Sequence, residues 1–282
     1  MLKKKEQFMR LIFLFSACTS IIAVFLICIF LFANGIPAIS KIGVFNFLLG
    51  KNWKPSNALF GILPMILGSI YVTAGAILIG VPIGVLTAMY LSLFCPKKLY
   101  RMIKPAIELL AGIPSVVYGF FGLVVLVPFV RNYIGGNGSV MLTASILLGM
   151  MILPTIINVS ESAIRAVPSN YYEGGRALGA SHERSAFFVI LPAAKSGVFA
   201  SIVLGVGRAI GETMAVIMVA GNQARMPKGL LKGVRTLTAN IVIEMGYAAD
   251  LHREALIATA VVLFIFILII NLSFSLLNRK SI

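Results

Sequence analysis

Apolar residues run along the chain in six blocks, and each is long enough to form a helix that crosses a bilayer, which takes about 20 residues. The second block contains Gly80-Val81-Pro82. We expect one kinked or tilted helix there, because each half alone would be too short to span. The first block follows Lys3, Lys4 and Lys5 but shows no cleavage site, so it is expected to be a retained helix rather than a signal peptide. The six predicted spans are residues 11–33, a segment within 61–94, 105–130, 139–160, 197–220 and 255–277.

The composition supports this interpretation. Of the 282 residues, 59% are hydrophobic and 12% are charged, and the mean hydropathy is +1.00. A soluble domain of this length needs more polar surface, so the chain is predicted to be an all-α membrane protein with one transmembrane domain over residues 1–282. The three cysteines and two histidines show neither a disulfide nor a metal-ligand spacing.

The net charge of +15 is expected to reflect topology rather than binding of nucleic acid. With the N-terminus in the cytoplasm, 14 Lys and Arg residues fall on the cytoplasmic side and 9 on the other side, while Arg208 lies within a span. This excess predicts that both termini are cytoplasmic, that residues 161–196 face the cytoplasm, and that residues 34–60 and 221–254 face outward.

The sequence "YYEGGRALGASHERSAFFVILP", residues 171–192, predicts a helix–turn–helix on the cytoplasmic face. Pro168-Ser169-Asn170 favours a helix start, and Gly179 allows a sharp turn. In a second short helix, 181–188, Phe187 and Phe188 would form an apolar side opposite a polar side of His182, Glu183 and Arg184. Such a segment can lie on lipid or enter a groove on a partner protein.

The sequence "GVGRAIGETMAV", residues 205–216, places Arg208 and Glu212 inside an otherwise apolar span. In a continuous helix, residues four apart share a face and can pair. Each charge costs about 3 kcal/mol in mid-bilayer, so both must face a protein interior, a subunit interface or an aqueous path. Either the two charges neutralise each other and hold helices together, or Arg208 offers its planar fork to a passing oxyanion.

Four lesser features carry expectations of their own. Lys104 and Glu108 are predicted to pair at the start of the third span, with Pro105 at the first helical position. Ser115 and Tyr118 follow Ile113-Pro114 and either line a pathway or belong to a packed kink. Trp53 is expected to be an interfacial anchor. The outward cations Arg225, Lys228, Lys232 and Arg235 either attract an anion or a binding protein, or form an ordinary solvated loop.

Residues 171–192 resemble the "EAA" signature of ABC-importer permeases. The matching positions are Glu173, Gly174, Gly175, Gly179, Val189, Leu191 and Pro192, with glycines where the family usually has alanines. The resemblance implies that Glu173, Gly179 and the 181–188 helix, with Ser181, His182, Glu183 and Arg184, dock on a cytoplasmic ATPase. The chain has no GxxxxGK[ST] motif, so no cofactor is expected in it, and ATP with Mg²⁺ is expected to be bound by a separate ATPase subunit.

A narrower resemblance connects three segments with phosphate-specific ABC permeases of the PstC type. The segments are "GVGRAIGETMAV", "TLTANIVIEMGYA" at residues 236–248 and "LAGIPSVVYGFFGL" at residues 110–123. This resemblance implies a type I ABC-importer permease fold with six transmembrane helices and a coupling helix, in the bacterial inner membrane. It also implies phosphate passage by Arg208 and Glu212, a second homologous permease, two ATPase subunits and an extracytoplasmic phosphate-binding protein.

Three alternatives remain at this stage. A permease for another oxyanion, such as molybdate, tungstate or sulfate, would use the same arginine fork, which reads charge and shape alone. An ungated anion channel would conduct without ATP. An intramembrane enzyme lacks support, because no nucleophile–base motif falls within the spans.

Overall fold

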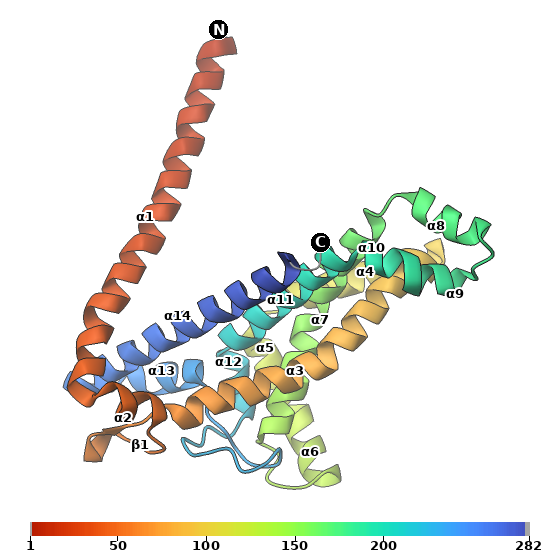
Figure 1. Cartoon of the computed structure of the whole chain (residues 1–282). Helices are drawn as coiled ribbons and strands as arrows, with labels where there is room; N and C mark the ends of the chain where they lie inside the picture. Colours follow the sequence, from red (N-terminus) through yellow and green to blue (C-terminus); the bar gives the residue numbers. More distant parts are fainter. Residues whose placement is uncertain (1, 280–282) are drawn as a thin grey trace.

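The structure is a computed structural model that describes the backbone of residues 2–279 and the side chains of residues 6–274 and 276. The described chain is almost entirely helical (Figure 1). The helices are α1 (Leu2–Ile42), α2 (Val44–Leu49), α3 (Leu63–Met89), α4 (Lys97–Gly112), α5 (Ser115–Phe121), α6 (Val127–Tyr133), α7 (Met141–Arg165), α8 (Ser169–Ala177), α9 (His182–Ser185), α10 (Leu191–Ala193), α11 (Lys195–Gly211), α12 (Met214–Val219), α13 (Leu237–Met245) and α14 (Asp250–Arg279). Shorter helical segments are η1 (Pro55–Asn57), η2 (Tyr90–Phe94), η3 (Gly122–Leu126) and η4 (Ala186–Ile190), and the strands are β1 (Trp53–Lys54) and β2 (Leu59–Phe60).

Five helical segments of the described chain are long and apolar enough to cross a membrane. They are Glu6–Ile42, Leu63–Phe94, Ser115–Tyr133, Met141–Arg165 and Asp250–Phe274. A sixth is added when α11 is taken together with the segment His182–Ala193, against which it bends by 72°. The second span runs through Pro82 as one helix, as expected, and the multi-pass helical class is confirmed.

The third predicted span, 105–130, is wrong at its start. Residues 97–112 form the separate helix α4, which contains Pro105 in its interior rather than at its first position. The helix ends before Ile113-Pro114, because the residue that precedes a proline is driven out of the helical region. The membrane-crossing segment is Ser115–Tyr133 instead.

The core of the molecule lies where α3, α7 and α11 pack together (Figure 1). Gly80 and Gly84 bring the α3 backbone close to α7, since a Cβ atom at these positions would meet Ile152 and Ile156 at 2.8 and 2.7 Å. The fully buried side chains there include Leu147, Leu148 and Met151 of α7. This contact fixes the position of α7, on which the candidate site is built.

Helix α1 lies apart from this core and projects away from the other helices (Figure 1). Only its C-terminal part contacts α14, through an edge-to-face contact of Phe32 with Phe264 and an ion pair of Lys41 with Glu254. None of its most apolar stretch is buried by the rest of the described chain. The side chains of Lys3, Lys4, Lys5, Arg279 and Lys280, which entered the orientation count, lie outside the described residues.

The two segments predicted to share the outward side do lie together and form one layer. Trp53 of β1 donates a hydrogen bond to Glu244 of α13 (Nε1–Oε2 2.8 Å), and His252 of α14 contacts the same oxygen at 2.8 Å. Arg235 binds the other carboxylate oxygen of Glu244. Trp53 is therefore a buried part of this layer, which corrects its predicted role as an interfacial anchor.

Candidate functional site

The fifth predicted span is broken beside the charged residues that it contains. Helix α11 ends at Gly211, and Glu212 has extended backbone angles (φ −67°, ψ 129°) before α12 begins at Met214. Arg208 and Glu212 therefore do not share a helical face, and the predicted pairing is wrong, since no ion pair joins these two described residues. Irregular backbone at membrane depth is tolerated only where protein covers it or where it lines a water-filled cavity.

Arg208 is held by a single hydroxyl among the described residues. Its Nη1 donates to Thr155 Oγ1 of α7 at 3.2 Å, and the side chain is half-buried. Gly207 and Gly211 flank it, and a Cβ atom at either position would meet nothing within 4 Å. The backbone of α11 is therefore uncovered at these two glycines, and Arg208 lies between them in the last turn of α11, where the helix dipole favours a cation.

Glu212 caps the next helix. Its Oε1 accepts hydrogen bonds from the backbone N–H groups of Thr213 (3.1 Å) and Ala215 (3.2 Å). A carboxylate at a helix N-terminus is favoured by the unpaired N–H groups and by the dipole. The backbone oxygen of Glu212 also accepts a hydrogen bond from the Thr238 hydroxyl of α13 at 3.1 Å. Within the part of the chain that the structure describes, no carboxylate therefore binds the guanidinium of Arg208.

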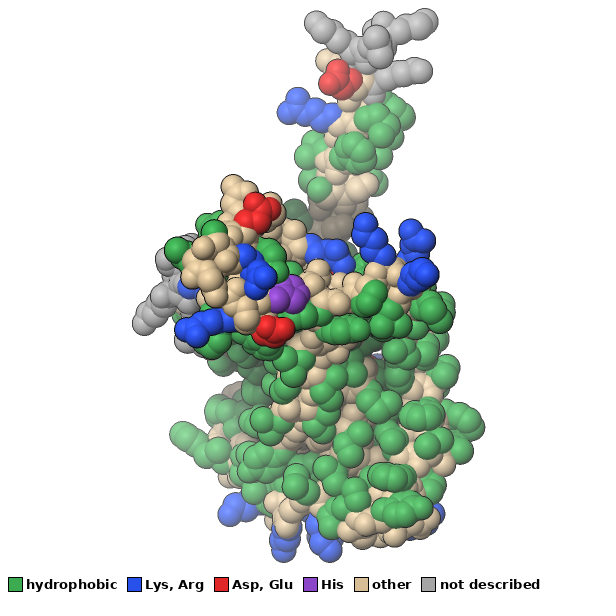
Figure 2. Space-filling model, turned by 90° about the vertical axis from the view of Figure 1, so that its right-hand side faces the viewer, with side chains coloured by type: hydrophobic (Ala, Val, Ile, Leu, Met, Phe, Trp, Pro, Cys, Tyr) green, Lys and Arg blue, Asp and Glu red, His purple; other side chains and the backbone are tan. Residues whose placement is uncertain are grey.

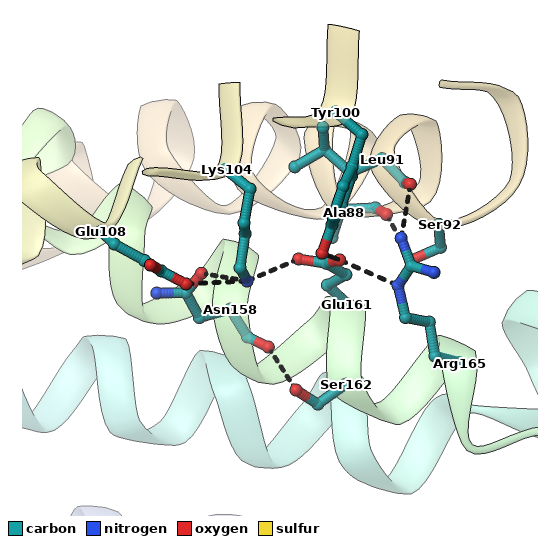
Figure 3. Close-up of polar contacts among 10 residues, drawn as sticks. All are labelled: Ala88, Leu91, Ser92, Tyr100, Lys104, Glu108, Asn158, Glu161, Ser162 and Arg165. Carbon is teal, nitrogen blue, oxygen red and sulfur yellow. Dashed lines mark hydrogen bonds and ion pairs between the residues drawn. The ribbon is translucent and has the colours of Figure 1, made fainter. Parts of the chain in front are cut away.

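A polar cluster on α7 escaped the sequence analysis (Figure 3). Glu161, which is 2% exposed, accepts hydrogen bonds from Tyr100 Oη (2.7 Å), Lys104 Nζ (2.8 Å) and Arg165 Nε (2.9 Å). The hydrogen bond to Glu161 raises the pKa of the Tyr100 phenol. Arg165 also donates to the backbone oxygen of Leu91 (Nη2–O 3.0 Å), so the cluster ties α4 and η2 to the end of α7.

The predicted pair of Lys104 with Glu108 is present, but Lys104 binds this cluster more closely. The distance from Lys104 Nζ to Glu108 Oε1 is 3.9 Å, whereas its hydrogen bond to Asn158 Oδ1 is 2.9 Å long. Asn158 and Thr155 lie one turn apart on α7, so this helix holds Lys104 and Arg208 at neighbouring levels. Polar residues three or four apart in the 155–165 segment are the signal that sequence reasoning overlooked.

Tyr118 closes the break between α4 and α5. Its hydroxyl donates to the backbone oxygen of Leu110 at 2.9 Å, and its side chain is buried. This contact favours the packed-kink alternative for Tyr118 over a residue that lines a pathway.

The predicted helix–turn–helix is present in residues 169–193. Helix α8 is followed by Gly179 at φ +85°, a conformation that suits glycine. Ser181 caps α9 by accepting a hydrogen bond from the backbone N–H of Arg184 at 3.2 Å. Glu173, Glu183 and Arg184 are exposed at this end of the molecule, where charged side chains gather above a hydrophobic surface (Figure 2).

His182 and the two phenylalanines differ from the expected two-sided helix. His182 Nδ1 contacts the Tyr172 hydroxyl of α8 at 2.6 Å, and its ring packs on Phe94 at 4.3 Å between centroids. His182 therefore fastens the two short helices to the end of η2, while its side chain remains partly exposed. Phe187 and Phe188 point outward, and Phe188 is 76% exposed, while Ala186 and Ile190 form the buried side.

The sequence profile of one protein family, described as the binding-protein-dependent transport system inner membrane component, matches residues 80–282. The chain is 39% identical to the probable ABC transporter permease protein YqgH of Bacillus subtilis, over 93% of this chain and 88% of that protein. It is 36% identical to the phosphate transport system permease protein PstC of Mesorhizobium japonicum, over 85% and 79% of the two chains.

Solved structures show the same fold. One is the crystal structure of a bacterial alginate ABC transporter in complex with an alginate-pentasaccharide-bound periplasmic protein. The match covers 95% of the present chain and 94% of the chain in that structure, with a TM-score of 0.69 and 16% sequence identity. An inward-facing structure of the MetNI methionine ABC transporter matches 82% of this chain and is covered to 100%, with a TM-score of 0.64 and 20% identity. The predicted type I ABC-importer permease fold is thereby confirmed.

Proposed function

Because the chain belongs to the family of binding-protein-dependent transport system inner membrane components, we propose that it is the permease subunit of an ATP-driven importer of inorganic phosphate. Relatives that are 32–36% identical are named as phosphate transport permeases, which supports phosphate over other oxyanions. The observation that carries the proposal is Arg208, a cation beside the break of an apolar span whose guanidinium has one hydrogen-bond partner, Thr155, among the described residues.

Arg208 is the proposed contact for the anion as it crosses the membrane. A guanidinium offers a planar fork of N–H donors that matches two oxygens of a phosphate. Only Thr155 binds it among the described residues, the Arg208 side chain is partly exposed, and α11 is uncovered at the neighbouring Gly207 and Gly211. Glu212 keeps the neighbourhood close to neutral without occupying the fork, because its carboxylate caps α12.

The partners follow from the surfaces that this chain leaves uncovered. A second homologous permease would cover the pathway at Arg208, and two ATPase subunits would dock on the segment from Glu173 to Arg184. An extracytoplasmic phosphate-binding protein would deliver the anion to the layer formed by residues 34–60 and 221–254. In this arrangement both termini face the cytoplasm, as do residues 169–193, which form the coupling segment, and ATP with Mg²⁺ binds to the ATPases alone.

Transport would proceed by alternating access. Closure of the ATPases would move α8 and α9, and these are fixed to the ends of α3, α7 and α11 by the buried cluster around Ala186 and Ile190. The helices that carry Arg208 and Thr155 would then shift together, because α11 and α7 pack along each other. Such rigid-body movement of packed helices is a common form of switching.

The test is uptake of labelled phosphate by the assembled transporter in proteoliposomes. Arg208→Gln removes charge-assisted hydrogen bonds worth about 1.5–3 kcal/mol each, so uptake should fall by about tenfold to more than a hundredfold. The matched control Arg131→Gln, an exposed arginine at the end of α6, should transport normally. Copurification of the ATPases must persist in both variants.

Each part of the proposal has its own contradicting result. Normal uptake in Arg208→Gln excludes the pathway role, and loss of assembly assigns Arg208 to structure. If unlabelled sulfate or molybdate suppresses the uptake of labelled phosphate more strongly than unlabelled phosphate does, phosphate is rejected as the substrate. Anion conductance by the chain without ATP or partners rejects the importer in favour of a channel.

A further inference from the structure

A second basic site lies at the end of the molecule that carries the coupling segment, and the pathway does not use it. A pocket of about 410 Å³ opens between the end of η2, the start of α4 and the end of α7. Its polar lining consists of Ser92, Lys97, Tyr100, Arg101 and Arg165. Three of these side chains are cationic, and no carboxylate lines the pocket.

Two of the three pocket cations lack counter-ions among the described residues, whereas Arg165 is paired with Glu161. Lys97 and Arg101 lie four residues apart on α4, and neither forms a hydrogen bond or ion pair with another described residue. Like charges at this spacing destabilise a helix unless an anion lies between them. The pocket therefore has a net positive charge that its own lining does not balance.

Arg165 is held in place at the edge of the pocket. Its Nε binds Glu161, its Nη2 binds the backbone oxygen of Leu91, and its guanidinium lies over the Tyr100 ring at 4.8 Å. Nη1 has no partner among the described residues. A donor positioned in this way binds an anion with little loss of side-chain entropy.

The position of the pocket decides which anion it suits. It lies where the spans Leu63–Phe94 and Met141–Arg165 end, next to the outward-facing apolar side chains of Leu99 and Met102, the latter 74% exposed. Figure 2 shows Lys and Arg side chains gathered at this end, above a surface that is mostly hydrophobic. Phosphate-bearing headgroups of anionic lipids lie at this level, and basic pockets between membrane helices bind them.

We propose that this pocket binds the phosphate group of an anionic phospholipid, with Lys97, Arg101 and Arg165 around the headgroup and the acyl chains along the apolar side of α4. The bound lipid would hold α4 and the end of α7 against the membrane, next to the start of the coupling segment. A free phosphate ion shares the same chemistry, and the experiment separates the two sources.

The experiment measures lipid retained by the assembled transporter in nanodiscs that contain phosphatidylglycerol and phosphatidylcholine, by mass spectrometry after extraction. We expect enrichment of phosphatidylglycerol, and a decrease of about fivefold in its affinity for each pocket cation removed in Lys97→Gln and Arg101→Gln. Lys98→Gln is the matched control, because Lys98 is an exposed neighbour on α4 that does not line the pocket.

Three results would overturn the proposal. Equal loss in Lys98→Gln would mean diffuse attraction rather than a site, and equal retention of the two lipids would mean no selectivity for charge. Displacement of the lipid by millimolar inorganic phosphate would assign the pocket to the free ion. The readout is lipid binding rather than transport, so it stands whichever anion the transporter carries.

Discussion

Arg208 and Glu212 show how one span can carry two charges that do not pair. Each lies at the helix end that its charge favours, the cation in the last turn of α11 and the carboxylate before the first turn of α12. The spacing of four residues predicted an ion pair on one face, because it assumed a continuous helix. Gly211 before the break and Thr213 as the following N-cap residue were the local signals of a break.

Glu161 is the residue on which the stability of the cluster in Figure 3 depends. Removal of one partner from a buried ion pair leaves an uncompensated charge and costs about 3–5 kcal/mol. Arg165 is half-exposed and can regain water, so we expect Glu161→Ala to destabilise the protein by about 3 kcal/mol. The measurement is the free energy of unfolding of the solubilised chain.

Glu108→Ala is the control for that prediction. Glu108 is the other acid beside Lys104, but it is exposed and 3.9 Å away, so its removal should change stability by less than about 0.5 kcal/mol. Equal losses in the two variants would mean that Glu161 contributes no more than an ordinary surface charge.

At the scale of elements, the pattern of apolar residues predicted the long helices well and their interruptions poorly. The second, fourth and sixth spans lie where expected, because a continuous apolar stretch of that length has few alternatives in a membrane. The second half of α4, residues 105–112, was merged with the third span, since the apolar count continued through Ile113-Pro114, whereas the four cations of α4 all precede Pro105. The cluster around Glu161 joins segments 54 to 74 residues apart, and a single sequence gives no signal of such pairings.

The break between α11 and α12 makes a prediction about these two elements. If Glu212 caps α12 and does not pair with Arg208, a double-mutant cycle of Arg208→Gln and Glu212→Gln should give a coupling energy below about 0.5 kcal/mol. Glu212→Gln keeps an oxygen that can accept the capping hydrogen bonds, whereas Glu212→Ala should cost about 1 kcal/mol as a lost cap. Unfolding of the solubilised chain measures both, and a coupling well above 1 kcal/mol would restore the ion pair.

At the scale of the whole molecule, large apolar surfaces are not covered by the rest of the described chain. The apolar stretch of α1 finds no cover in the rest of the described chain, and Leu178 and Phe188 of the coupling segment are 92% and 76% exposed. Exposed apolar surface of this kind marks contacts with lipid or with other proteins. The coupling segment nevertheless has a fixed position, because His182 packs between Tyr172 and Phe94 and the buried cluster joins it to three long helices.

Because the coupling segment is packed firmly against the long helices but exposes Glu173, altering Glu173 should disturb docking of a partner without disturbing the fold. Glu173 is exposed on α8 and its side chain forms no hydrogen bond or ion pair with another described residue, so Glu173→Lys should leave the fold and the pathway intact. A reversed charge at a docking surface costs several kcal/mol against a complementary partner. We therefore expect phosphate uptake to fall by about tenfold or more, while ATP hydrolysis continues without stimulation by the binding protein. Glu6→Lys, the same reversal on the free end of α1, should leave both activities unchanged. Normal stimulation of ATP hydrolysis in Glu173→Lys would contradict docking of this segment on the ATPase. The movement of the ATPases would then have to reach α7 and α11 by another route.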